Sequence, residues 1–431
     1  MHLARRAYLL VLLAAVMAIA GIWSSGESVA GLWHVPAGLL LLGLAFEAWF
    51  MRRAPLSVAL ETAPRAFLGR SQPAAFVFTN QAARALSIAY APATPEGFEP
   101  FTEVREVRAP ARGSAPDRLT LWPVRLGPQH WPALPARIRG PLELAWWNSS
   151  LVPAAQVVVA PDALRAAART QGLPGGARPR RAVGAGAELH QLRAYLPGDP
   201  LARIDWKATA RAGTLITRDF SEDQHLDILV AIDAGRFSRI RAGRLDRLGC
   251  YANLAARFAE LVTHHDDRIG LVVYADRVLA SCAPARGLAG VRRLRSALEQ
   301  LSVQAAESDP TAAAVSIRAL LKHRALIVLL TDLDDANLAD QLARAVRLLA
   351  PPHLVVVAGV HSGEIGALAE REAQSWRDPW IALAAEEHEL RAQGQRTFLQ
   401  RLGAPVVAAP AERLEQAVFA EYEALRRSRR V

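Results

Sequence analysis

The chain has 431 residues, 52% of them hydrophobic, and a formal net charge of +10. This length predicts two or three domains with substantial cores. Its two cysteines, Cys250 and Cys282, exclude a disulfide-stapled secreted module and show no CxxC spacing. The positive charge is almost all arginine and is spread along the chain, which argues against a nucleic-acid-binding protein.

Two apolar segments open the chain, at residues 7–23 and 29–51. Each has roughly the ~20 residues needed to cross the bilayer core, so residues 1–53 are expected to form a hairpin of two transmembrane helices. Arginine pairs flank the hairpin at Arg5-Arg6 and Arg52-Arg53, and the short loop between the segments has neither lysine nor arginine. The positive-inside rule therefore places both termini and the soluble domains in the cytoplasm, on a multi-pass protein of the inner membrane.

Two details of the apolar segments have alternative interpretations. Ala18-Ile19-Ala20 resembles a signal-peptide cleavage site, but the second segment would still anchor the chain if the first were removed. Glu47 interrupts the second segment about one turn from the inner face. We expect its carboxylate to reach water there.

Residues 54–163 contain short β-rich runs separated by Pro, Gly, Asn and Asp clusters. This punctuation predicts an all-β sandwich. The expected strands are 56–60, 75–79, 86–90, 102–107, 119–126 and 156–159. Four tryptophans in this region are expected to fill the core or its edges, although a stacking platform for a sugar or peptide is the alternative. They are Trp122, Trp131, Trp146 and Trp147.

Residues 226–431 alternate apolar runs with amphipathic stretches. Such alternation predicts an α/β domain with a mostly parallel sheet covered on both faces. The expected strands are 226–232, 269–274, 325–331, 354–360 and 405–408. The expected helices are 245–264, 288–301, 311–323, 338–349, 380–402 and 412–426.

Residues 164–225 are expected to connect the two soluble domains. Arg178, Arg180 and Arg181 in this connector are a possible contact with anionic membrane lipid, and a solvated linker is the alternative. The connector ends in a dense motif of mixed charge around a Pro-Gly turn. The motif residues are Glu188, Arg193, Tyr195, Pro197, Gly198, Asp199, Arg203, Asp205, Trp206, Lys207, Arg211 and Arg218.

Acidic and basic side chains occur in similar numbers in this motif. We expect them to form an ion-pair network that locks the connector onto the α/β domain, with Trp206 buried beneath it. The alternative is a docking face, or a small anion-binding pocket built from the arginines.

The motif resembles the signature of a bacterial family, domain-of-unknown-function family 58, whose members are commonly encoded beside MoxR-type AAA+ ATPases. The resemblance implies two membrane spans, an immunoglobulin-like β module, the signature, and a von Willebrand factor A-like domain of Rossmann type. It assigns no reaction. It implies a MoxR-type AAA+ ATPase as the partner, in a chaperone-like or assembly role.

A von Willebrand factor A-like domain often holds Mg²⁺ at the carboxyl edge of its sheet through an Asp-x-Ser-x-Ser motif. Here Asp233 is followed by Gly235 and Phe237 where the two hydroxyls belong. Thr311 and Asp332 match the remaining ligands of the family pattern. Because Mg²⁺ requires near-octahedral oxygen ligands, the loss of two hydroxyls predicts a degenerate metal-ion-dependent adhesion site.

Without an ion, the carboxylates of Asp233 and Asp332 are expected to cap the turns that follow them. Arg236 is expected to neutralise this pair, and Asp334 and Asp335 to lie in a solvated loop. Binding of Mg²⁺ by Asp233, Thr311 and Asp332 is the alternative.

The segment 264–267, His-His-Asp-Asp, is expected to form a polar loop, and metal ligation is the alternative. The chain has no GxSxG, P-loop, HExxH or Cys-His zinc spacing, so no catalytic residue is assigned. We therefore expect a non-enzymatic membrane adaptor without a cofactor. A metal-dependent hydrolase using Asp233, Asp332 and the segment 264–267 is the alternative function.

Overall fold

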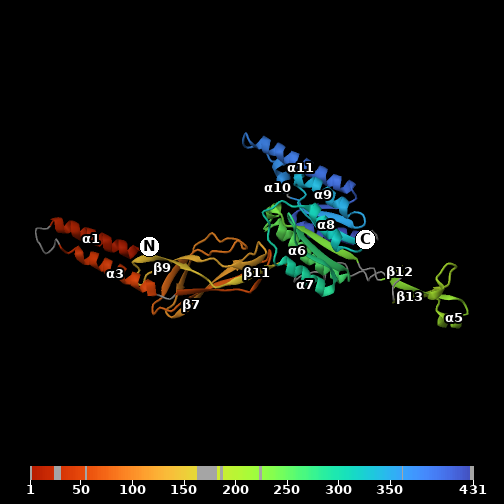
Figure 1. Ribbon diagram of the computed structural model, residues 1–431. Coiled ribbons are helices and arrows are strands. Elements are labelled where there is room, and N and C mark those ends of the chain that lie inside the picture. The colour runs from red at the N-terminus through yellow and green to blue at the C-terminus, as the bar shows by residue number, and fades with distance from the viewer. Residues whose placement is uncertain are drawn as a thin grey trace. The chain divides into compact units, whose positions relative to one another are not determined.

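The structure is a computed structural model that describes residues 2–23, 31–53, 56–162, 182–184, 188–222, 226–361 and 363–427. It divides into two compact units, Met1–Ala160 and Pro161–Val431, and each is described by itself below (Figure 1). The first part of the connector, residues 164–181, lies outside the described residues, together with its candidate lipid contacts Arg178, Arg180 and Arg181.

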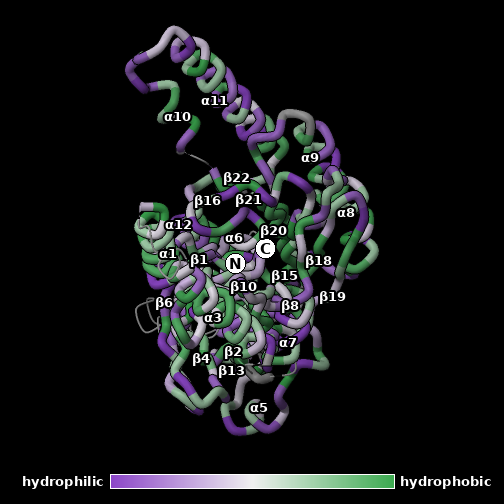
Figure 2. Tube along the Cα trace, turned by 90° about the vertical axis from the view of Figure 1, so that its left-hand side faces the viewer, coloured by the Kyte–Doolittle hydropathy of each residue, from purple (hydrophilic) through white to green (hydrophobic). Residues whose placement is uncertain are grey.

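The first unit begins with two apolar helices, α1 (Arg5–Trp23) and α3 (His34–Arg53), which pack against each other. Both are largely green in the hydropathy view of Figure 2. Most of their large side chains are exposed, as at Leu12 (61%) and Leu42 (71%). Both helices are long and apolar enough to cross a membrane, which confirms the two predicted apolar helices.

Glu47 of α3 does not reach water, so that expectation is wrong. Its side chain is fully buried (0% exposed), and its carboxylate accepts hydrogen bonds from the backbone N–H groups of Leu142, Leu144 and Ala145, each at 3.0 Å. The indole of Trp147 donates a fourth bond at 3.3 Å. These four donors, from the turn between β9 and β10 and the start of β10, therefore take the place of the water that a carboxylate would otherwise bind.

The rest of the first unit is a β module of three sheets. Strand order is β1-β10-β9-β5-β6 in the first sheet, β2-β4-β7 in the second and β3-β11-β8 in the third. The strands are β1 (His2–Leu3), β2 (Leu56–Glu61), β3 (Arg65–Phe67), β4 (Gln72–Asn80), β5 (Leu86–Tyr90), β6 (Arg105–Ala109), β7 (Gly113–Leu121), β8 (Gly127–His130), β9 (Leu134–Arg139), β10 (Ala145–Leu151) and β11 (Gln156–Ala160). The prediction of a β-rich middle region is confirmed.

The module closes around aromatic side chains. Phe76, Phe78 and Tyr90 are at most 1% exposed, and Trp131 is 5% exposed with its ring 6.3 Å from that of Phe76. Alternate residues of β4 point inward, as expected for a strand with one buried face. Trp131 is thus a core residue.

The second unit contains a six-stranded sheet in the order β19-β18-β15-β20-β21-β22, parallel except for the edge strand β19. The strands are β15 (Asp227–Asp233), β18 (Arg268–Tyr274), β19 (Val278–Arg286), β20 (Ala325–Leu330), β21 (Leu354–Val360) and β22 (Val406–Ala409). The predicted α/β region with a parallel sheet is confirmed. β19 was not predicted, because its small residues and Pro284 weaken the strand pattern.

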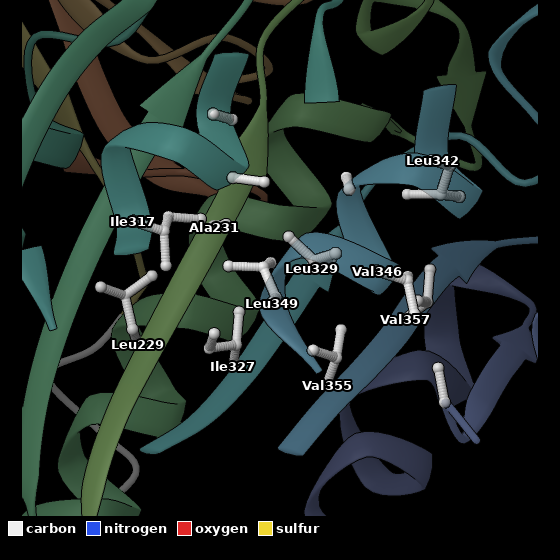
Figure 3. Close-up of a cluster of buried hydrophobic side chains, with 14 of the residues drawn as sticks. Leu229, Ala231, Ile317, Ile327, Leu329, Leu342, Val346, Leu349, Val355 and Val357 are labelled. Carbon is white, nitrogen blue, oxygen red and sulfur yellow. The ribbon is translucent and has the colours of Figure 1, made fainter. Parts of the chain in front are cut away.

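The sheet is covered by helices on both faces, since nearly every residue of β15, β20 and β21 is buried whichever way it points. Helices α8 and α9 cover one face, where Ile317, Leu342 and Val346 pack on the sheet (Figure 3). The helices are α6 (Arg247–His264), α7 (Gly287–Leu298), α8 (Pro310–Leu320), α9 (Ala336–Leu349), α10 (Gly363–Glu370), α11 (Asp378–Arg401) and α12 (Ala411–Arg427).

Short elements complete the second unit. The 3₁₀ turn η3 (Arg236–Arg239) and the two-residue strands β16 (Arg241–Ala242) and β17 (Leu245–Asp246) follow β15. A separate antiparallel sheet, in the order β12-β14-β13, holds the signature motif. Its elements are β12 (Ala182–Gly184), β13 (Glu188–Ala194), η2 (Leu201–Arg203), α5 (Trp206–Ala212) and β14 (Ile216–Glu222), and we call them the signature module.

Candidate functional site

The signature module is built on the pairing of β13 with β14, which joins Arg193 to Thr217 and Ala194 to Ile216. The turn after β13 contains Gly198 at φ +109°, a conformation that favours glycine. Glu188 lies at the start of β13, and Pro197 precedes the glycine in the turn. The backbone N–H of Tyr195 bonds to the carbonyl of Leu215, which closes the loop between the strands.

Two acidic residues of the motif hold the module together. The Asp199 carboxylate accepts hydrogen bonds from both terminal nitrogens of Arg193, at 2.7 and 2.9 Å, and from the N–H of Leu196. The Arg193 hydrogen bond, with help from Leu196, lowers the pKa of Asp199 to about 2. Asp205 caps α5 by accepting from the N–H of Ala208 at 3.0 Å, which lowers its pKa, and Arg218 lies 3.6 Å from its second oxygen.

Trp206 is not buried, so that expectation is wrong. Its side chain is 66% exposed, while Ile204, two residues earlier, is 2% exposed and takes the interior position. The reason is position: Ile204 pairs with Thr217 through an isolated β-bridge, whereas Trp206 begins the seven-residue helix α5, none of whose residues is buried.

Apolar and basic residues share the surface of the module. The exposed large apolar side chains are Leu192 (47%), Leu196 (58%), Leu201 (70%), Trp206 (66%) and Leu215 (44%). Lys207 and Arg211 are exposed on α5, and Arg203 is partly exposed beside them. Exposed aromatic and aliphatic side chains together with arginine and lysine are features of protein-binding surfaces.

The second candidate site is the carboxyl edge of the parallel sheet, where open α/β sheets place their ligands. Asp233 ends β15 and is 3% exposed. Its first oxygen accepts from the N–H of Gly235 at 2.9 Å and from the hydroxyl of Ser308. Its second oxygen accepts from the hydroxyl of Thr331 at 2.8 Å. Burial raises the pKa of Asp233, and these bonds oppose that shift.

The two hydroxyls on Asp233 were not predicted. Ser308 fills the space that a side chain at position 235 would need, because a Cβ added to Gly235 would lie 2.1 Å from the Ser308 hydroxyl. The hydroxyl missing from the motif is thus supplied by another loop. Thr331 was visible in the sequence as the residue before Asp332, but it follows β20, whereas Asp233 ends the neighbouring strand β15.

Asp332 and Asp334 are neutralised by Arg247, which begins α6. The guanidinium contacts Asp332 and lies 2.9 Å from Asp334, with only 4%, 7% and 9% of the three side chains exposed. Burial raises the pKa of Asp332, although Arg247 opposes it. Asp334 therefore does not lie in a solvated loop, because a buried guanidinium compensates its charge.

Arg236 does not neutralise the pair, contrary to expectation. Its guanidinium lies 2.8 Å from Glu307 and 4.7 Å from the ring of Phe237, both near the surface. Thr311 lies on α8, where its hydroxyl is turned to the carbonyl of Gln341 at 3.4 Å and its N–H is capped by Asp309. The hydroxyls that reach Asp233 thus come from other residues than Thr311.

The segment 264–267 lies at the opposite edge of the sheet. Asp267 comes just before β18, so it marks the amino end of a strand parallel to β15. Its carboxylate is fully buried and accepts from the N–H of Leu226 at 3.1 Å and the hydroxyl of Tyr422 at 2.8 Å. A seven-residue strand, roughly 20 Å long, therefore separates it from Asp233. Within the described ranges no cluster of three His, Cys, Asp or Glu side chains is placed to hold a metal ion.

Comparison with known families gives one match. Residues 191–366 match the model of the family described as "Protein of unknown function DUF58". The match begins inside the signature module and extends through most of the α/β sheet, which confirms the family predicted from the motif. No curated protein matches the chain.

Three of the solved structures that match parts of this chain do so with low TM-scores. The CARDB domain of a Pyrococcus furiosus protein is 10% identical, with a TM-score of 0.18, over 25% of this chain and 93% of that one. Proximal thread matrix protein 1 from the mussel byssus is 12% identical, with a TM-score of 0.27, over 44% and 43% of the two chains. A protein of unknown function from Porphyromonas gingivalis is 17% identical, with a TM-score of 0.20, over 39% and 80%.

Proposed function

We propose that this chain, whose residues 191–366 match the DUF58 family, is a non-enzymatic adaptor anchored in the inner membrane that docks a protein partner through its signature module. The observation that carries the proposal is the exposure of Trp206 (66%) on a module in which Arg193 holds Asp199 and Arg218 lies beside Asp205. Because the ion pairs hold the module together, the exposed Trp206 side chain is available to contact a partner. Trp and Arg dominate the binding energy of protein interfaces.

The architecture supports this role. In our proposal α1 and α3 span the membrane, and Arg5-Arg6 and Arg52-Arg53 keep both termini in the cytoplasm. We assign the β module to the immunoglobulin-like class and the α/β domain to the von Willebrand factor A-like class. The sheet order, with the antiparallel strand at one edge and Asp233 at the end of an inner strand, supports the second assignment.

The partner we propose is a MoxR-type AAA+ ATPase, as the signature resemblance implies, in a chaperone-like or assembly role. The module exposes the basic residues Lys207 and Arg211 as well as the apolar residues Leu201 and Trp206. It therefore suits a partner surface that combines an apolar pocket with acidic residues. The adaptor has no P-loop, so the ATPase supplies the energy of any remodelling.

The contacts of Asp233 and Asp332 at the carboxyl edge of the sheet support our proposal of an adaptor without a resident metal. Both oxygens of Asp233 accept hydrogen bonds from protein groups, and Arg247 already balances Asp332. A Mg²⁺ ion here would have to displace these bonds and lie beside a guanidinium. The residues of the alternative hydrolase also lie at opposite edges of the sheet, so we favour no reaction there.

The test is binding of the full chain, purified in mild detergent, to a MoxR-type AAA+ ATPase, with and without ATP. We expect Trp206→Ala to weaken binding by about tenfold or more, as for a buried interface tryptophan. The matched control is Trp376→Ala, a tryptophan of similar exposure (76%) outside the module. The control is expected to bind as the wild type does.

Three outcomes would overturn the proposal. The first is the absence of binding under either nucleotide condition, and the second is equal binding by the Trp206→Ala variant and the wild type. The third is a turnover reaction of the full chain that disappears in Asp233→Ala or Asp332→Ala while circular dichroism shows the fold intact.

A further inference from the structure

The strand β19 leaves one edge of the large sheet open. Among the described residues it pairs only with β18, and this pairing is regular from Ala280 to Cys282 and irregular on either side. An edge strand presents unpaired N–H and C=O groups, which soluble proteins usually protect with charged residues, proline or bulges. Residues 280–282 have neither a charge nor a proline, so they form a short window where a further strand can pair.

A groove runs along this open edge. Its volume is about 460 Å³, and β19 contributes Leu279, Ala280, Ser281 and Cys282 to its lining. Successive side chains of a strand point to opposite faces of the sheet. A groove lined by four successive residues therefore follows the edge of the strand rather than one of its faces.

The opposite wall of the groove is one stripe of α7. Arg293, Ser296 and Ala297 belong to this helix, and Gln300 follows its end. The spacing i, i+3, i+4 and i+7 places these four residues on one side of a helix. An exposed sheet edge beside a groove is where proteins accept an extended peptide as an added strand.

Arg293 gives the groove its charge. Its side chain is exposed and forms no ion pair within the described ranges. Burial raises the pKa of the Cys282 thiol, and Arg293 opposes that shift, so the guanidinium lies near the strand. An occupant that satisfies this arginine must bring a carboxylate, because charge-assisted hydrogen bonds between the two groups are strong.

Two occupants from this protein itself fit the groove poorly. Residues 163–181, the longest segment outside the described ranges, have five arginines and no acidic residue, so they would be repelled. A second copy paired edge to edge would be antiparallel about a two-fold axis. Its α7 would then lie beside the first α7 on one face of the joined sheet, with Arg292 and Arg293 on both helices.

We propose that the groove between β19 and α7 binds an extended segment of a partner protein that carries an aspartate or a glutamate. The segment adds a strand beside residues 280–282 through main-chain hydrogen bonds, and its carboxylate contacts Arg293. This surface is separate from the signature module, so it gives the proposed adaptor a second place to hold a protein.

The experiment pans a phage-displayed library of random peptides against the full chain in detergent. We expect the enriched peptides to carry an acidic residue and to lack proline, which cannot donate to a strand ladder. Their affinities are then measured by fluorescence polarisation with synthetic labelled peptides. Arg293→Glu is expected to weaken binding by about tenfold or more. Exchanging the acidic residue of the peptide for lysine should restore binding to this variant, which a misfolded variant would not show.

The matched control is Arg292→Glu, the same charge change at the neighbouring exposed residue, which does not line the groove. Its affinity is expected to stay within about twofold of the wild type. Trp206→Ala is expected to bind the peptides as the wild type does, which separates this groove from the signature module.

The two cysteines report where the peptide lies. Saturating peptide should slow labelling of Cys282 by iodoacetamide by about tenfold or more, because the thiol becomes covered. Labelling of Cys250, which does not line the groove, should keep its rate. A library without enriched acidic peptides, equal affinities of Arg293→Glu and Arg292→Glu, or an unchanged rate at Cys282 would each overturn the proposal. Peptide binding that depends on Trp206 instead of Arg293 would overturn it as well.

Discussion

Arg247 and Asp332 form an ion pair at the carboxyl edge of the parallel sheet, with 4% and 7% of their side chains exposed. The arginine begins α6 and the aspartate follows β20, so the pair joins two loops far apart in the chain. Asp334 shares the same guanidinium at 2.9 Å. The position where the motif predicts a divalent ion is thus next to a fixed positive charge of the protein itself.

Replacing Arg247 leaves two buried carboxylates without their counter-charge. We expect Arg247→Met to lower the free energy of unfolding by about 3–5 kcal/mol, the usual cost of breaking a buried pair from one side. Urea unfolding followed by tryptophan fluorescence measures the change. The control is Arg236→Met, which removes a pair that is 49% and 75% exposed and is expected to stay within about 1 kcal/mol of the wild type. Equal losses in the two variants would contradict the assignment.

The packing of Gly235 against Ser308 predicts a non-additive pair of substitutions. Gly235→Ser restores a hydroxyl of the adhesion motif but brings its Cβ to 2.1 Å from the Ser308 hydroxyl. We expect a loss of about 1–3 kcal/mol from overpacking. Adding Ser308→Gly should recover part of this loss, because it vacates the same space. Unfolding free energies of the two single variants and the double variant give the coupling, and additive values would refute the shared position.

The buried Asp233 predicts a defined pH dependence. Burial raises its pKa above the ordinary 3.8, so the folded state holds the proton more tightly than the unfolded state. This contribution is complete below pH 3.8 and is lost as the pH rises through the raised pKa. Asp233→Asn removes the titration, so its stability relative to the wild type should increase between acidic and neutral pH.

Asp199→Asn is the control, because its stability relative to the wild type should change with pH in the opposite direction. Arg193 lowers the pKa of Asp199 to about 2, so its contribution is present above pH 3.8 and is lost as the pH falls toward 2. The Asp199→Asn variant should therefore lose stability relative to the wild type as the pH rises. Thermal unfolding at a series of pH values measures both trends. The same sign in both variants would contradict the opposite directions assigned to the pKa shifts of Asp233 and Asp199.

The carboxylate of Glu47 predicts that the β module depends on the helix α3. Glu47→Gln turns one acceptor into a donor that faces the N–H of Leu142, Leu144 or Ala145. We expect a loss of about 1.5–3 kcal/mol, typical of a hydrogen bond to a charged group. Thermal unfolding of the full chain in detergent tests this. Glu103→Gln, at an exposed position of the same unit, should leave the transition unchanged.

The signature module predicts opposite outcomes for two neighbouring residues. Ile204→Ala removes a side chain that is 2% exposed, and we expect a loss of about 2–5 kcal/mol in the local stability of the module. Trypsin should then cleave faster after Lys207 and Arg211. Trp206→Ala removes a side chain that is 66% exposed, so cleavage should keep the wild-type rate. Faster cleavage of the Trp206→Ala variant would show that the indole supports the fold rather than a surface.

Local pattern was enough for the elements whose residues are neighbours in the chain. The apolar length of α1 and α3, the alternation that yields the parallel sheet, and the motif that leads to the DUF58 family are all visible without coordinates. The edge strand β19 and the eight-residue helix α10 were missed, because small residues and short length leave little periodicity to detect.

The tertiary structure decided which side chains meet. Thr331 reaches Asp233 across 98 positions and Arg247 reaches Asp334 across 87, because the crossovers of a parallel sheet bring distant loops to one edge. Periodicity reports only that a residue points inward, and it carries no information about the partner it finds there. The same limit explains Glu47, which sequence placed in water and the fold placed under a turn 95 to 98 residues away. Sequence thus determined the layers of this protein, and long-range chain topology determined the partners of its buried charges.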